Sequence, residues 1–382
     1  MKSVQHYAKA VQNRTMDYIN QRRGWTIDRK IIVIESDDWG SIRMPSKEVY
    51  DKLLNYGIRV DKCSFCSNDS IASEDDLSLL FDMLYSIKDF KGNSLCLTAN
   101  AVVANPDFDK IRESNFNDYH YKLITDGFKE IKGCENSLSL WKQGLSNNCF
   151  FIQNHGREHI NVDRWLNSLR QNLPETKYAF DLGVYGISTK ITSEKRKSYL
   201  PAFDFESLEQ ERKVNEIVED GLDIFKQLFG YNSESFIAPN YVWGKSLENV
   251  IHKNGVKFIQ GISVINQPIL NDSHYKLVSR YLGEENNNSQ INLVRNVTFE
   301  PSLDINKDWI DSSLSQIDSV FKLKKPAIIS SHRVNYIGRL NPINRDRNIL
   351  IIKNLFKEIL KKWPDVEFMN SVQLGTLIYE SK

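Results

Sequence analysis

Two adjacent aspartates, Asp37 and Asp38, follow the aliphatic run Ile31 to Ile34. A continuous aliphatic run has no polar face, so it predicts a fully buried strand. Neighbouring carboxylates at the end of such a strand repel each other and are costly to remove from water. They persist mainly where a positive group neutralises them, and a metal ion is the obvious candidate. The alternative is a turn or a helix cap that simply follows the strand.

His155 and His159 form a second candidate group, directly after the short apolar strand predicted at 149–153. On a helix, a spacing of four residues places both imidazoles on one face, within reach of one ion. Two histidines and one carboxylate leave coordination positions open for water and substrate, as in catalytic zinc sites. The alternative is that one histidine caps a helix and the other is exposed.

Two more predicted strands end in groups that could take part. The strand at 326–331 is followed by His332, which could act as a general acid opposite the metal. Taken alone, such a histidine is more often a buried core residue. The strand that ends at Pro239 leads into Asn240. Active sites of α/β barrels lie at the carboxyl ends of the strands, so these groups are expected to converge.

Short apolar strands alternate with helical patterns along the chain, which predicts parallel βαβ units. About seven or eight units can be counted, enough to close a barrel, and no glycine-rich phosphate motif follows the first strand. Helices are expected at 46–56, 73–89, 163–173, 207–229, 247–254, 308–323 and 345–363. Irregular structure is expected at 58–73 and 281–293. We predict a helical extension at 1–29 and one domain with elaborated loops at 30–382.

The charge balance argues against several classes of partner. The chain has 50 basic and 49 acidic residues without a basic tract, so no nucleic-acid partner is expected. No apolar run is long enough to predict a transmembrane segment. The N-terminal stretch has no apolar core of a signal peptide, which predicts a cytoplasmic location. The sequence does not indicate an oligomeric state.

The cysteines give a weaker signal. An odd number of them, five, favours a reducing compartment. Cys63 and Cys66 form a lone Cys-x-x-Cys in a predicted polar loop. With no second pair, a zinc knuckle is not expected, and the loop setting argues against a thioredoxin-like function.

At three points the sequence resembles the polysaccharide deacetylase family, the NodB-homology carbohydrate esterases. The matching segments are Glu35–Gly40 with the paired aspartates, His155–His159, and Ile328–His332. The resemblance implies a distorted (β/α)7 barrel that binds one divalent metal ion, usually zinc. It implies Asp38, His155 and His159 as metal ligands. It also implies Asp37 as general base and His332 as general acid.

The other family motifs match loosely. Phe236–Asn240 keeps a phenylalanine and a proline, but Ile237 stands where the family carries the arginine that supports the catalytic aspartate. Arg333, next to His332, is the candidate to replace that arginine. The resemblance further implies that a backbone N–H near Asn240 helps to hold the oxyanion, and that Asp308 orients His332. The alternative for Asp308 is a helix cap.

The sequence therefore predicts a metal-dependent hydrolase that removes N- or O-acetyl groups from a carbohydrate. The predicted substrate-contacting residues lie next to the motifs; they are Trp39, Tyr241, Trp243, Arg333 and Glu300. For the aromatic residues, core packing is the alternative.

Two other functions stay open at this point. One is cleavage of a glycan by a different reaction, with Asp37 and Glu300 as the carboxylate pair. The other is a carbohydrate-binding pseudoenzyme, which the isoleucine at position 237 suggests.

Overall fold

The computed structural model describes residues 19–187, 198–272 and 274–382. Most of the predicted N-terminal extension, 1–29, lies outside these ranges. The division into an extension and one domain at 30–382 therefore stays a prediction.

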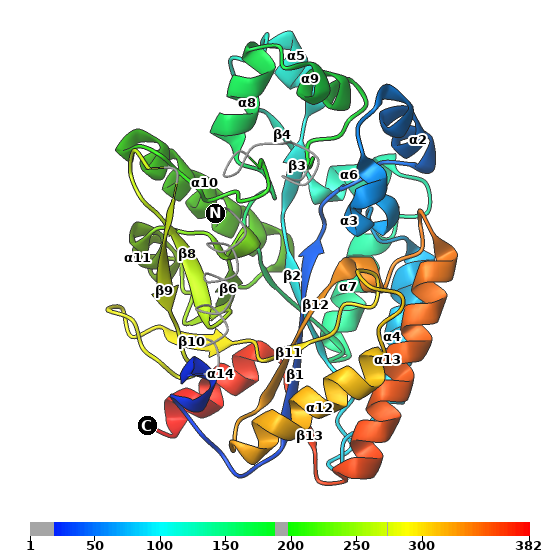
Figure 1. The fold of residues 1–382 in the computed structure, drawn as a ribbon, viewed down its shortest axis with the longest axis vertical. Helices are drawn as coiled ribbons and strands as arrows, with labels where there is room; N and C mark the ends of the chain where they lie inside the picture. Colours follow the sequence, from blue (N-terminus) through cyan, green and yellow to red (C-terminus); the bar gives the residue numbers. More distant parts are fainter. Residues whose placement is uncertain (1–18, 188–197, 273) are drawn as a thin grey trace, which may run out of the picture.

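A curved parallel sheet forms the centre of the molecule (Figure 1). Its strands lie in the order β10 (Ile291–Val294), β7 (Phe258–Gly261), β6 (Ser235–Ile237), β5 (Phe150–Asn154), β2 (Leu97–Ala101), β1 (Ile31–Trp39), β12 (Ala327–His332) and β11 (Val297–Thr298). The two edge strands, β10 and β11, are separated in sequence only by Arg295 and Asn296. The chain itself therefore closes the sheet. With β10 and β11 counted as one interrupted strand, this is the predicted distorted (β/α)7 barrel.

Helices cover the outside of the barrel (Figure 1). They are α4 (Glu74–Ser86), α6 (Ile124–Glu130), α7 (Ser137–Ser146), α10 (Leu208–Phe229), α11 (Lys245–Lys253), α12 (Trp309–Lys322), α13 (Pro342–Lys362) and α14 (Ser371–Glu380). Residues Ile31 to Ile34 of β1 have no exposed surface, as a strand between two layers requires. The short β13 (Glu367–Phe368) pairs with the start of β1.

Many of the remaining elements lie in the upper part of Figure 1, towards which the carboxyl ends of the strands point, whereas one two-stranded hairpin lies lower, beside α11. The remaining elements are α2 (Lys47–Tyr56), η1 (Val60–Lys62), α3 (Ser64–Asn68), β3 (Ala104–Pro106), α5 (Phe108–Glu113), β4 (Tyr121–Leu123), α8 (Val162–Arg170), α9 (Pro174–Asp181), η2 (Pro239–Tyr241), β8 (Val264–Pro268), β9 (Tyr275–Ser279) and η3 (Arg333–Asn335). β8 and β9 form an antiparallel hairpin.

The helix ends with clear capping signals are confirmed. Ser46 accepts a hydrogen bond from the N–H of Val49 at the start of α2, and Gly57 ends this helix with a φ of 105°. Ser73 and Asp76 form a capping box at α4. α10 begins after Ser207 and ends at Gly230, as predicted.

Two stretches predicted as irregular contain regular structure. Residues 58–73 hold η1 and α3, and residues 281–293 hold most of β10. Both predictions were wrong because the elements are short and their neighbours are polar. Only tertiary packing, for instance of β10 against β7, gives such segments a defined conformation.

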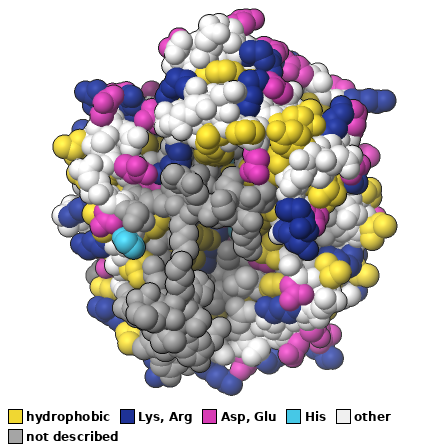
Figure 2. All heavy atoms as spheres, turned by 45° about the horizontal axis from the view of Figure 1, so that its top comes forward, with side chains coloured by type: hydrophobic (Ala, Val, Ile, Leu, Met, Phe, Trp, Pro, Cys, Tyr) yellow, Lys and Arg dark blue, Asp and Glu magenta, His cyan; other side chains and the backbone are white. Residues whose placement is uncertain are grey.

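On the face shown in Figure 2, basic and acidic side chains of the described residues are intermixed, and these side chains form no extended region of one charge. This agrees with the formal net charge of +1. Among the described residues, none of the helices combines the length and the apolar character that a membrane span requires.

Candidate metal centre

A bulge at the end of β1 brings both aspartates into the site. The register between β1 and β2 shifts between Ser36 and Trp39, and Asp38 has a φ of 73°. In a regular strand, neighbouring side chains point to opposite faces. A bulge changes the direction of a side chain, and the left-handed backbone at Asp38 is the strain that accompanies it, at about 1–3 kcal/mol.

Asp38, His155 and His159 form one cluster. The Oδ1 atom of Asp38 lies 3.5 Å from Nε2 of His155 and 3.2 Å from Nε2 of His159. One possible ligand atom from each residue lies within 4.8 Å of the others. Such a group of donor atoms can surround one ion.

The two histidines do not lie on a helix, so this part of the prediction was wrong. They lie in the loop between β5 and α8. Gly156 takes a φ of 99°, and its N–H donates to Oδ1 of Asn154 at 2.7 Å. This turn places the two rings 5.2 Å apart, centroid to centroid. The spacing still brings both imidazoles together, but through a glycine turn.

The protonation states in this cluster fit a divalent metal ion. Nδ1 of His155 lies 2.9 Å from the carbonyl oxygen of Ile237 and donates to it, so the lone pair is on Nε2. That Nε2 is buried and has no hydrogen-bond partner among the described residues. Burial lowers the pKa of His159, which keeps its ring neutral. Burial raises the pKa of Asp38, whereas positive charge on the neighbouring imidazoles lowers it well below its usual range. With both rings neutral, a metal ion would be the positive group that keeps this carboxylate ionised.

Neutral imidazoles and an ionised carboxylate are the ligand set that zinc and similar ions bind. The residues present therefore fit the ion that the sequence predicted. Ile237, at the position of the expected arginine, contributes its backbone carbonyl to this arrangement instead.

Asp37 is held by Arg295, from the two-residue link between β10 and β11. Nη2 and Nη1 of Arg295 each donate to one carboxylate oxygen of Asp37 at 2.7 Å, and Nε donates to Glu35 at 2.7 Å. Burial raises the pKa of Asp37, but Arg295 outweighs it and lowers this pKa to about 2. Asn100 also donates to Asp37, at 2.8 Å. The carboxylate is therefore ionised and fixed in orientation.

Arg333 was the wrong choice for this function and for substrate contact. Its side chain is fully buried. It donates to Asp69 at 2.9 and 3.0 Å and to the carbonyl oxygen of Ser41 at 2.7 Å. These bonds connect loops beneath the site, where a substrate does not reach.

His332 is oriented by Glu300 and not by Asp308. Its Nδ1 lies 2.6 Å from Oε1 of Glu300, and Oε2 of Glu300 accepts from Asn335 at 2.8 Å. Burial lowers the pKa of His332, but the charge and hydrogen bond of Glu300 raise it well above its usual range. Nε2 of His332 lies 3.9 Å from Oδ2 of Asp37. Asp308 caps α12 instead, by accepting from the N–H groups of Ile310 and Asp311.

Glu300 is itself buried, and both of its oxygens are engaged. It is therefore a positioning residue for His332, and the prediction that it contacts the substrate was wrong. Asp37, its partner in the glycan-cleavage alternative, is equally engaged by Arg295.

Two of the three predicted aromatic contacts belong to the core. Trp39 is 1% exposed and lies edge-on to Phe150 at 4.8 Å. Trp243 is 4% exposed and packs among the residues of β6, β7 and α11. Tyr241 is half-buried, and its hydroxyl accepts from Nη1 of Arg295 at 3.1 Å.

Asn240 follows β6 in the turn η2 and has a φ of 56°. The backbone bonds of this turn are made by the N–H groups of Tyr241 and Val242. The N–H of Asn240 has no acceptor among the described residues. It is thus free to bind a ligand oxygen, which keeps the predicted oxyanion contact open.

The sequence reasoning missed Arg295, Asn100 and Phe65. The ring of Phe65 lies edge-on to the His332 imidazole, with centroids 5.2 Å apart. One signal was present: Arg295 directly follows the mostly apolar stretch Ile291 to Val294, where a charged residue is unusual unless it is paired.

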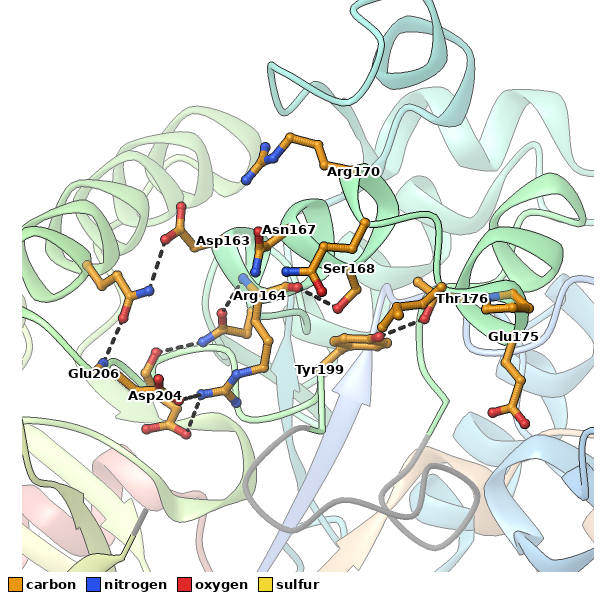
Figure 3. A pocket seen from close by; sticks show the side chains of 15 residues that line it. Asp163, Arg164, Asn167, Ser168, Arg170, Glu175, Thr176, Tyr199, Asp204 and Glu206 are labelled. Atoms are coloured by element: carbon orange, nitrogen blue, oxygen red, sulfur yellow. Dashed lines mark hydrogen bonds and ion pairs between the residues drawn. The ribbon is translucent and has the colours of Figure 1, made fainter. Parts of the chain in front are cut away.

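A cavity of about 970 Å³ lies beside α8 and α9, outside the metal-ligand cluster (Figure 3). Its walls are polar: Arg164 donates to Asp204 at 2.9 Å, and the hydroxyls of Thr176 and Tyr199 are 2.7 Å apart. None of the residues that line it is a donor of the cluster. The donor atoms, and not this volume, identify the candidate centre.

No protein-family model and no curated protein matches the chain. Among solved structures it is similar to one from Pseudomonas aeruginosa described as a probable polysaccharide deacetylase, at 10% identity, with 91% of each chain covered and a TM-score of 0.46. It is also similar to a family 4 acetyl xylan esterase from Clostridium thermocellum in complex with a cobalt ion, at 12% identity, with 91% of each chain covered and a TM-score of 0.33. A third similar structure is an α-amylase from Thermotoga maritima, at 10% identity, with 91% of this chain and 74% of the other covered and a TM-score of 0.44. With TM-scores below 0.5, these matches carry no inference about the activity of this chain.

Proposed function

We propose that the protein is a metal-dependent hydrolase that removes acetyl groups from an N- or O-acetylated carbohydrate. The observation that carries the proposal is the arrangement at one barrel mouth of a metal-ligand cluster, an ionised carboxylate and a protonated imidazole. A divalent ion, most simply Zn²⁺, would supply a Lewis acid there and lower the pKa of a bound water.

The side chains around the cluster divide the proton transfers between them. Asp37 is ionised and held in place by Arg295, so it can accept a proton from the attacking water. His332 donates its Nδ1 proton to Glu300, so its Nε2 proton is available for the departing amine or alcohol. The 3.9 Å between His332 Nε2 and Asp37 Oδ2 puts acid and base on the same reacting centre. The N–H of Asn240 is our candidate for the oxyanion contact.

The alternatives receive less support. The pseudoenzyme hypothesis depended on the lost arginine, and Arg295 supplies a guanidinium to Asp37 from another strand. The glycan-cleavage hypothesis needs Asp37 and Glu300 as a free carboxylate pair, but both are bound by cationic side chains.

The test is acetate release by the purified chain. N-acetylglucosamine oligomers and an acetylated xylan are incubated with chelator-treated protein, with and without added Zn²⁺. Acetate should appear only with the metal. Cleaved glycan without acetate would favour the other hydrolytic reaction. Bound metal without any product on either substrate would contradict the proposal.

Replacing Glu300 by glutamine should shift the pH dependence of this activity. A histidine with a raised pKa is active as an acid at low pH and loses its proton as the pH rises through that pKa. Without the Glu300 charge, the pKa of His332 falls, so the alkaline limb of the rate profile moves to lower pH. At the alkaline end the rate should fall by about tenfold or more. The same rates at all pH values as in the wild type would show that Glu300 does not act through His332.

Replacing Asp308 by alanine is the matched control for this experiment. Asp308 accepts two backbone hydrogen bonds at the start of α12. Its loss should lower the free energy of unfolding by about 0.5–2 kcal/mol. The pH profile should stay unchanged, and a shifted alkaline limb in this variant would support the orienting function that the sequence first suggested.

A further inference from the structure

A pair of thiols lies close to the candidate centre. Cys63 is the residue before α3, and Cys66 is the third residue of this helix. Cys63 therefore holds the cap position of α3, from which a side chain lies beside the second and third helical residues. Both belong to one buried cluster packed between α2, η1 and α9. Cys63 is 9% exposed and Cys66 2%, so small reagents reach Cys63 first.

A buried guanidinium, that of Arg43, lies in the surroundings of the two sulfurs. Arg43 is 8% exposed, and its Nε has no hydrogen-bond partner among the described residues. The other buried guanidiniums, of Arg157, Arg295 and Arg333, are paired with carboxylates. A buried cation needs a counter-charge.

The ionisable groups around Arg43 are Cys66, Cys63, Tyr185, Asp38 and Asp69. Asp38 belongs to the metal-ligand cluster, and Asp69 accepts from Arg333. A thiolate at the cysteine pair would add a negative charge beside Arg43.

The two thiols are chemically distinct. A hydrogen bond from Cys66 and the charge of Arg43 lower the pKa of Cys63 to about 5, although burial opposes this. The same hydrogen bond and burial raise the pKa of Cys66 well above its usual value. The pair therefore holds one thiolate and one thiol at neutral pH. Dithiols that form a disulfide readily have this asymmetry.

Helix α3, which begins directly after Cys63 and contains Cys66, contacts His332, the proposed general acid of the candidate site. Phe65 lies between the two cysteines in sequence, and its ring is in edge contact with His332. The guanidinium carbon of Arg43 lies 5.9 Å from the centroid of the same Phe65 ring. Asp69, directly after α3, binds Arg333, the neighbour of His332. A change in α3 thus reaches His332 through Phe65.

We propose that Cys63 and Cys66 form a peroxide-sensitive dithiol that regulates the neighbouring site. The thiolate sulfur of Cys63 attacks one oxygen of a hydroperoxide, the O–O bond breaks, and Cys63 becomes a sulfenic acid. The second oxygen leaves as hydroxide and takes up a proton. The sulfur of Cys66 then attacks the Cys63 sulfur, the S–S bond forms, and the S–O bond breaks. With hydrogen peroxide, two thiols lose two electrons and the peroxide yields two molecules of water.

The disulfide would change α3 and the charge next to it. A disulfide requires a Cβ–Cβ distance of about 3.8 Å and a defined dihedral angle about its S–S bond. The start of α3 must adopt this geometry, and we expect this to move Phe65, which lies between the two cysteines, relative to His332. Oxidation also removes the thiolate beside Arg43. The effect on activity rests on the proposed function, whereas the thiol chemistry does not.

The chemistry is tested by treating the reduced full-length protein with one equivalent of hydrogen peroxide. Free thiols are then alkylated under denaturing conditions, and the peptides are weighed by mass spectrometry. The expected product is a Cys63–Cys66 disulfide with Cys96, Cys134 and Cys149 still alkylated. In Cys66→Ser, Cys63 should be trapped by dimedone as a sulfenic acid. Cys134→Ser, a buried control, should react like the wild type. Oxidation spread over all five cysteines, or none at Cys63, would overturn the proposal.

The regulatory half has its own readout. The oxidised protein should release acetate at about one tenth of the rate of the reduced protein, or at a lower rate still. Dithiothreitol should restore the rate. The rate of Cys63→Ser should not change on treatment with peroxide. A disulfide that leaves the rate unchanged would overturn regulation while the dithiol stands. If no form of the protein releases acetate, the proposed function fails, and the peptide masses still decide on the dithiol. The His332 imidazole signals in NMR spectra then test the link through Phe65, because they should shift on oxidation of the wild type and not of Cys66→Ser.

Discussion

Replacing Asp38 by asparagine should abolish binding of the divalent ion and lower acetate release by about a thousandfold or more. Lewis-acid activation is worth several kcal/mol, and each 1.36 kcal/mol is a factor of ten in rate. Asparagine is the right replacement because it tolerates the left-handed backbone that Asp38 adopts. The fold should therefore survive while the carboxylate charge is lost. Metal content per chain and the rate of acetate release are measured together.

The matched control is His252→Ala, which removes an exposed imidazole on α11, away from the cluster. It should keep full metal content and full rate. If Asp38→Asn binds zinc as tightly as the wild type, the ligand assignment is wrong. If it loses the metal but keeps the rate, the metal takes no part in the reaction.

Replacing Arg295 by methionine should be the most destabilising single change in the site. It leaves Glu35 and Asp37 buried without their cation, which typically costs about 3–5 kcal/mol of unfolding free energy. Chemical denaturation at pH 7 measures this loss. The rate should fall as well, because Asp37 is no longer held as an oriented carboxylate.

The pH dependence of the Arg295→Met effect has a definite sign. In the wild type, the pKa of Asp37 is depressed to about 2, so its ion pair contributes stability above the unfolded-state pKa, and this is lost only as the pH falls through about 2. In the variant the two buried carboxyls lack a cation and take up protons at higher pH. The difference in the free energy of unfolding between the variant and the wild type should therefore become smaller as the pH is lowered from 7 towards 5.

Arg29→Met is the control for this experiment, because Arg29 pairs with Glu367 but is 39% exposed. It should cost less than about 1 kcal/mol. Equal losses for the two variants, or a loss at Arg295 that does not depend on pH, would contradict the assigned ion pair.

The metal-ligand residues could be predicted because local sequence carries their signal. A buried strand that ends in two aspartates and a close histidine pair are visible without a structure. The barrel follows from the alternation of strands and helices. The glycine turn at Gly156 shows the limit of such reasoning: the spacing of His155 and His159 was informative, but the assumed helix was wrong.

The supporting residues could not be predicted because they come from distant parts of the chain. Arg295 reaches Glu35 across 260 positions, at the point where the barrel closes between β10 and β11. The sequence predicted a strand at 295–299 but none at β10, so it did not show that the barrel closes at Arg295. Likewise, Asp308 has the sequence features of both a cap and an orienting carboxylate, and only the fold shows that Glu300 lies beside His332.

The most direct test of the central claim is anomalous diffraction at the zinc edge from crystals grown with one equivalent of Zn²⁺. We predict one strong peak about 2.0–2.2 Å from a carboxylate oxygen of Asp38 and from Nε2 of His155 and of His159. A peak at another position, or no peak at these three side chains, would contradict the proposed metal centre.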